Sequence, residues 1–291
     1  VVANNTSSSE KVQYELSGST SNGYFKVYSN NKQAIVLNNV SITNPEGAAI
    51  NNQGKKRCYV IVNGSNSLSD GSAYTQTPDG EDEKAAFFSE GQLIFSGSGS
   101  LKVTASGKSG ITSDDYVHFM GSPVVSVTSS AGHGIRGKDA VIVSGGTLEA
   151  RVSAAMKKGV ASDSLVCFRG GETTIAVTGG VAYDSDDAEY KASAGVKADQ
   201  VFVMQDGSLT ITNSGSGGKG VSGDGPGYFQ GGSLTVTVTG SNYGSSGGGM
   251  GGGMGPGKSS ASDNSKSAKG IKFDGNIYIS AGTVIVKASN H

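Results

Sequence analysis

Carboxylates are concentrated in two segments that interrupt an otherwise regular chain. The first runs from Asp70 to Lys84 and the second from Tyr183 to Tyr190. Closely spaced Asp and Glu can surround Ca²⁺, which takes about six to eight oxygen ligands in irregular geometry. We therefore predict a structural Ca²⁺ in these segments, with simple solvation as the alternative. The candidate ligands are Asp70, Asp79, Asp82, Glu83, Asp184, Asp186 and Asp187.

A basic group of residues recurs along the chain. A Gly followed by Ile or Val returns several times, and in three cases the residue before it is Lys: Lys158, Lys219 and Lys269. An acidic row follows the same phrase: Asp114, Asp139, Asp163, Asp199, Asp224 and Asp274. Like charges stacked at about 4.8 Å repel, so such rows persist only when solvated, paired or bridged. Local pairing is one interpretation, and contact with a charged or hydroxylated polymer is the other.

Tyrosines lie in the same interruptions and could stack against sugar rings. They are Tyr74, Tyr183, Tyr190 and, in a third interruption, Tyr243. Packing within the protein is the alternative role for each of them. The chain has no Trp, which argues against a flat platform for crystalline cellulose.

The elements that must position these residues follow from the spacing of the Gly-Ile/Val phrase. Successive apolar residues of the phrase lie about 24 to 25 residues apart, with longer steps where the chain is interrupted. The positions are Ile50, Phe87, Ile111, Ile135, Val160, Val196, Val221 and Ile271. A fixed period of this length indicates stacked units that bury one another's apolar faces.

Each period contains three short alternating runs separated by Gly, Ser, Asn and Asp, which is typical of strands and corners. A propeller blade needs four strands and about 40 residues. We therefore predict an all-β, right-handed, single-stranded parallel β-helix of about 24–25 residues per coil, with inserted loops. Residues 1–291 are expected to form one domain, with a strand-like end consistent with truncation. Residues 241–268 are predicted to be a flexible Gly/Ser-rich insertion.

Composition excludes several classes of protein. The net charge is −1, which argues against nucleic-acid or membrane-surface binding by bulk charge. No run of 18 apolar residues is present, so we expect no transmembrane segment. Cys58 and Cys167 lie about four coils apart and are expected to be unpaired, with Cys58 in the core and Cys167 facing out. A monomer is the favoured oligomeric state.

The order of short motifs resembles the clostridial-type carbohydrate-binding β-helix family, which is related in fold to polysaccharide lyases. The similarity runs from about residue 30 to the C-terminus. The motifs are Leu68–Gly71, Ala85–Ser89, Gly97–Leu101, Gly134–Asp139 and Val143–Leu148. The resemblance implies a secreted or surface protein of bacterial origin that binds plant-type polysaccharide, including acidic sugars, with calcium in its structure. The family commonly carries Asp-Gly where this chain has Lys-Gly, which shifts the expected metal into the acidic segments.

Three functions follow from these observations. The first is a non-catalytic polysaccharide-binding protein. Its contact residues would be Tyr74, Tyr183, Tyr190, Lys158, Lys219 and Lys269. The second is a calcium-dependent polysaccharide lyase, in which a basic Lys removes the proton beside a uronate carboxylate and a cation neutralises that carboxylate. The third is a purely structural or adhesive surface protein. Fold alone does not separate them.

Overall fold

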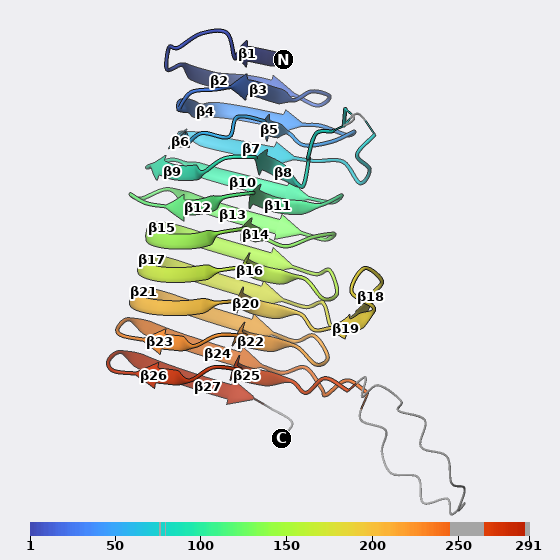
Figure 1. Ribbon diagram of the computed structural model, residues 1–291, viewed down its shortest axis with the longest axis vertical. Coiled ribbons are helices and arrows are strands. Elements are labelled where there is room, and N and C mark those ends of the chain that lie inside the picture. Colours follow the sequence, from blue (N-terminus) through green and yellow to red (C-terminus); the bar gives the residue numbers. More distant parts are fainter. Residues whose placement is uncertain (76, 79, 245–264, 289–291) are drawn as a thin grey trace, which may run out of the picture.

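The computed structural model describes residues 1–75, 77, 78, 80–244 and 265–288, and these form an all-β molecule. Figure 1 shows its strands stacked one above another along the long axis, with the N-terminus at one end and the last described strand at the other. Two parallel sheets and one small hairpin account for the strands of these residues.

The first sheet has ten parallel strands whose register follows the predicted apolar ladder. Ile50 pairs with Phe87, Phe87 with Ile111, and the series continues to Ile271. The sheet positions of the ladder are therefore confirmed. In sheet order the strands are β1 (Val2–Asn5), β3 (Phe25–Ser29), β5 (Ile50–Asn52), β8 (Ala85–Ser89), β11 (Ser109–Ser113), β14 (Ile135–Gly137), β16 (Lys158–Ser162), β20 (Ala194–Ala198), β22 (Lys219–Gly223) and β25 (Lys269–Phe273).

The second sheet contains fifteen strands. They are β12 (Tyr116–Phe119), β9 (Leu93–Gly97), β6 (Cys58–Asn63), β4 (Gln33–Thr43), β7 (Ser65–Ser69), β10 (Ser100–Ala105), β13 (Val124–Ser129), β15 (Ala140–Val152), β17 (Leu165–Val177), β21 (Val201–Asn213), β23 (Gly227–Phe229), β26 (Ile277–Ile279), β2 (Gln13–Thr20), β24 (Ser233–Val238) and β27 (Thr283–Ala288). The hairpin pairs β18 (Ala182–Asp184) with β19 (Glu189–Lys191) in antiparallel fashion.

The prediction of a single-stranded right-handed parallel β-helix is wrong, and the pairings of the second sheet overturn it. Pairings run from β12 through β9, β6, β4, β7, β10 and β13 to β15, and β15 pairs back with β12. By connectivity this closed circuit is an eight-stranded parallel β-barrel, and the ten-stranded sheet is additional to it.

Long bent strands explain the difference. Residues 33–38 of β4 pair with β6, whereas residues 41–43 pair with β7. β15 likewise pairs with β12 at its start and with β13 at its end. The Gly residues between the short runs were expected to form corners between strands. Gly146 instead takes a φ of +78° within β15, and the ladder continues past the irregularity.

Apolar residues from both sheets fill the interior. Phe119, Phe168 and Phe229 lie in one register, because Val143 and Met204 connect them across neighbouring strands. All three rings are buried. Full burial of such a side chain stabilises the fold by about 1.5–3 kcal/mol, so the columns fix the strands that carry the polar surface.

Both cysteines are free, as predicted, and Cys58 is buried in the core. Cys167 is buried as well, and the prediction that it faces outward into solvent is wrong. Its thiol lies on the strand face opposite Val166 and Phe168. There it is flanked by Ile142 and Val203 of the neighbouring strands, and these apolar neighbours explain its burial.

Among the described residues, no helix has the length and hydropathy needed to cross a bilayer. Much of the predicted 241–268 insertion lies outside the described residues, and its flexibility stays a prediction. Near its two ends, Tyr243 and Lys266 form an antiparallel bridge.

Candidate functional site

The ten-stranded sheet carries a basic groove of about 400 Å³ towards its C-terminal end. Its lining comes from β14, β16, β20, β22 and β25, with further residues from β19 and from the segment before β25. Seven Lys or Arg side chains and four carboxylates line it. The groove therefore carries a local positive excess on a chain whose net charge is −1, and such an excess attracts anions.

Lys158 and Lys219 are half-buried in this groove. Burial, followed by neighbouring lysines, lowers the pKa of each ammonium group to about 8. The Lys158 Nζ donates to the Met156 carbonyl oxygen at 2.7 Å. Neither ammonium forms an ion pair within the described part of the chain. The charged forms of Lys158 and Lys219 are therefore held at a cost in free energy, and a bound anion would stabilise them.

His133 keeps one end of the groove uncharged. Its Nδ1 accepts the backbone N–H of Lys158 at 3.0 Å. Burial, together with the nearby cations Lys158, Lys157 and Arg136, holds the pKa of the imidazole well below its usual range. The ring therefore stays neutral near pH 7 and positions the start of β16.

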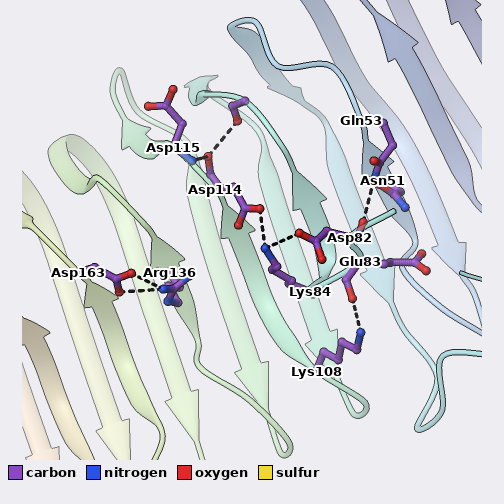
Figure 2. Close-up of polar contacts among 12 residues, drawn as sticks. Asn51, Gln53, Asp82, Glu83, Lys84, Lys108, Asp114, Asp115, Arg136 and Asp163 are labelled. Carbon is purple, nitrogen blue, oxygen red and sulfur yellow. Dashed lines mark hydrogen bonds and ion pairs between the residues drawn. The ribbon is translucent and has the colours of Figure 1, made fainter. Parts of the chain in front are cut away.

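A second row of cations lies along the groove. Arg136, Lys197 and Lys272 occupy equivalent strand positions, two residues after the Gly of each phrase. Figure 2 shows the Arg136 guanidinium beside Asp163, where it donates hydrogen bonds to both carboxylate oxygens at 2.7 and 2.8 Å. Lys197 bridges Asp199 and Asp224, and Lys272 pairs with Asp274 at 2.5 Å. Four members of the predicted acidic row, Asp163, Asp199, Asp224 and Asp274, are thus paired with this second row rather than with the predicted Lys row. Asp114 pairs with Lys84 instead.

The β18–β19 hairpin supplies an aromatic wall. Tyr190 lines the groove and contacts Tyr183 and Tyr243, with ring centroids 5.3 and 5.7 Å apart. Tyr183 is 54% exposed, so one ring face is available to solvent. The contact with Tyr243 joins the hairpin to the neighbouring insertion.

The hairpin carboxylates already have partners. Lys191 forms ion pairs with Asp184, at 2.8 Å, and with Asp187. The hydrogen bond from Lys191 lowers the pKa of the Asp184 carboxyl. This pairing holds the hairpin together and occupies two of the three predicted calcium ligands there, while Asp186 is exposed.

In the first acidic segment, Asp70 anchors a loop. Its carboxylate accepts the N–H groups of Ser106, Gly107 and Lys108 and the hydroxyl of Tyr74, at 2.6 to 3.3 Å. The Lys108 ammonium lies 4.5 Å from the centre of the Tyr74 ring. These contacts give Tyr74 a packing role and leave Asp70 few free lone pairs for an ion.

Glu83 is similarly engaged. It accepts the Ala48 N–H at 2.9 Å and the Thr77 hydroxyl at 2.6 Å. Asp79 lies outside the described residues.

Asp82 belongs to a different group, with Glu90 and Asp114, whose carboxylate oxygens lie within 4.8 Å of one another. Figure 2 shows Lys84 between two of these acids, 2.7 Å from Asp82 and 2.6 Å from Asp114. Burial, then the charges of Asp114 and Asp82, raises the pKa of the Glu90 carboxyl. Three oxygen donors with excess negative charge fit a hard cation, provided that it displaces the Lys84 ammonium.

Comparison with known proteins identifies the family. A family model described as "Carbohydrate-binding domain-containing protein" matches residues 3–155 and 152–291. The chain belongs to this family. Among solved structures, the polysaccharide lyase-like protein from C. thermocellum, studied as a gadolinium derivative, is similar with a TM-score of 0.57 and 17% identity, over 97% of this chain and 98% of that chain. At this identity the likeness shows the fold alone. No curated protein matches the chain.

In this carbohydrate-binding domain protein, the structure brings Lys158, Lys219 and Tyr190 together in one groove. Lys269 is exposed on β25 and does not line the groove, and Tyr74 belongs to another loop. Sequence reasoning missed the Arg136, Lys197 and Lys272 row. Its signal was available, since each of these residues follows a Gly-Ile or Gly-Val pair directly.

Proposed function

We propose that this carbohydrate-binding domain protein is a non-catalytic polysaccharide-binding protein that takes acidic, plant-type polysaccharide in the basic groove. The observation that carries the proposal is the pair of half-buried lysines, Lys158 and Lys219, which have no carboxylate partner in the described part of the chain. An anionic polymer would supply the charge that these ammonium groups lack. Tyr190 at the wall offers a ring for a sugar face.

The energetic logic favours binding to an anion. Burial lowers the pKa of both lysines, which means that their charged form is destabilised in the free protein. Hydrogen bonds between an ammonium and a carboxylate are about twice as strong as neutral ones. Binding would therefore relieve an existing cost while forming charge-assisted contacts.

Affinity electrophoresis and calorimetry with polygalacturonate test the proposal. We expect retarded migration for the native protein and loss of retardation for the double variant Lys158→Met/Lys219→Met. Lys102→Met, which removes an exposed lysine from β10, is the matched control and should migrate like the native protein. Migration of the native protein equal to that of an inert protein would overturn the proposal.

One observation favours a lyase as the second candidate. A Lys with a pKa of about 8 is partly neutral in mild alkali, as a base that removes the proton beside a uronate carboxylate must be. Incubation with polygalacturonate, with and without calcium, would release products containing a new carbon–carbon double bond, which absorb in the ultraviolet. Product formation that Lys158→Met abolishes would establish this activity; no product would exclude it.

Two further parts of the proposal are calcium and location. Calcium would bind as a structural ion, and the group of Asp82, Glu90 and Asp114 has the chemistry to hold it.

For location, we propose the bacterial cell surface or the secreted fraction, where plant-type polymers are encountered. Fractionation of cells that produce the native protein tests this location, and recovery only in the cytosol would contradict it. A purely adhesive role would leave protein–polymer affinity unaffected by the groove lysines.

A further inference from the structure

The groove crosses the strands and therefore runs along the stacking direction. Its lining strands β14, β16, β20, β22 and β25 are consecutive neighbours in the sheet. Paired strands lie about 4.8 Å apart, so five strands cover roughly 19 Å. One sugar unit of an extended 1,4-linked chain advances by a distance close to one strand spacing. The groove thus has room for about four or five units laid along it.

The groove cations alternate between two edges as one moves from strand to strand. Lys158 on β16 and Lys219 on β22 occupy one edge, and the register places Ala194 of β20 between them. At the other edge the register runs Arg136, Ala161, Lys197, Ser222 and Lys272. On the three central strands a small residue lies at the edge opposite the groove cation of the same strand: Ala161 on β16, Ala194 on β20 and Ser222 on β22.

The two edges differ in whether their cations are paired with carboxylates of the protein. Arg136, Lys197 and Lys272 are each paired with an Asp carboxylate. Lys158 and Lys219 have no such partner among the described residues. Carboxylates of a ligand are thus drawn to the Lys158–Lys219 edge, whereas sugar hydroxyls can donate to Asp163, Asp199 and Asp224 at the other edge.

We propose that the groove recognises an acidic polysaccharide by the spacing of its carboxylates, with Lys158 and Lys219 each binding a carboxylate on two units separated by one intervening unit. An extended chain with twofold character presents the same side on every second unit, which matches two strand spacings, roughly 10 Å. The intervening unit lies over Ala194 and turns its substituent towards Lys197, which is already shared by two carboxylates. A carboxylate on this unit is therefore dispensable. The inference rests on the proposed function and adds the orientation, register and minimum length of the ligand.

Calorimetry with purified oligogalacturonides of two to five units tests this register. The trimer is the shortest ligand that spans both lysines, and the second contact forms at high effective concentration. We expect affinity to rise about tenfold or more from dimer to trimer, a larger step than from trimer to tetramer. In Lys158→Met and in Lys219→Met the affinity for the dimer should fall about twofold, because the dimer can still bind the remaining lysine. The rise in affinity from dimer to trimer should disappear in both variants. Lys102→Met should retain the step.

A second ligand tests the dispensable carboxylate. Hyaluronan oligosaccharides carry one carboxylate for every two sugar units, and a pentasaccharide with acidic units at two units' separation should bind within about threefold of an oligogalacturonide that offers the same two carboxylates. A smooth rise in affinity with length, or binding that requires a carboxylate on every unit, would overturn the proposed register while leaving polysaccharide binding intact. If long polygalacturonate also fails to bind, the proposed function itself falls.

Discussion

Replacing Lys219 with Met should stabilise the free protein while weakening its binding to acidic polymer. Burial and the surrounding lysines lower the pKa of Lys219 from 10.5 to about 8. At about 1.4 kcal/mol per pKa unit, holding this charge in the folded state costs at most roughly 3.5 kcal/mol. Because the side chain is only half-buried, solvent screening reduces the expected gain to about 1–2 kcal/mol. For a chain of 291 residues the corresponding rise in Tm is roughly 2–3 °C.

The dependence of this gain on pH provides an internal check. Lys219 is charged in both folded and unfolded states below pH 8, so the full penalty applies there. The penalty disappears as the pH rises through 10.5, where the unfolded lysine also becomes neutral. Thermal unfolding of Lys219→Met and native protein should therefore differ at about pH 7 and converge near pH 10.5 to 11. Equal or lower stability of the variant at pH 7 would refute the claim that this ammonium is held at a cost.

Three further predictions concern the groove, a loop and the calcium site. Affinity for polygalacturonate at constant ionic strength should fall as the pH rises from about 7 to 9, because the Lys158 and Lys219 ammonium groups lose their charge near pH 8 while the ligand carboxylates stay ionised; unchanged affinity at pH 9 would contradict this. Asp70→Asn should cost about 1–3 kcal/mol in urea unfolding, because an amide nitrogen would face backbone N–H donors; an unchanged midpoint would show that the anchor is dispensable. Calcium should raise the Tm of native protein and not that of Asp114→Asn, whereas loss of the effect in Asp186→Asn instead would place the ion in the hairpin.

The apolar ladder was predictable because it depends only on an apolar residue that recurs at a nearly constant spacing. Ile111, Ile135 and Val160 fall in register on adjacent strands as expected. The closed circuit of eight strands was not predictable in the same way. It depends on whether a strand continues through a bend, and Gly146 is as compatible with a bulge inside a strand as with a corner between two strands.

The candidate site was likewise only partly predictable from the sequence. Lys158 and Lys219 were identified from their position before Gly, and the structure places both in the groove. Whether a carboxylate is free was not readable from sequence, because hydrogen-bond partners come from distant segments. Asp70 accepts from residues 36 to 38 positions away, and Glu90 reaches Asp114 only through strand pairing. Acidic composition therefore located the segments but not the three acids that come together.

The interruptions of the ladder and the groove are physically linked. The long step from Val160 to Val196 contains the β18–β19 hairpin, so the strand that carries Ala194 also receives the inserted wall with Tyr190. The next interruption returns through Tyr243 and Lys266 to meet that wall. Insertions at two neighbouring levels thus flank the stretch of sheet where Lys158 and Lys219 are half-buried without an ion-pair partner among the described residues. A uniform stack would have left those lysines in open solvent, where their ammonium groups would keep an ordinary pKa and gain little from an anion. The two insertions that lengthen the spacing of the ladder are therefore what makes these surface lysines part of a partly buried groove.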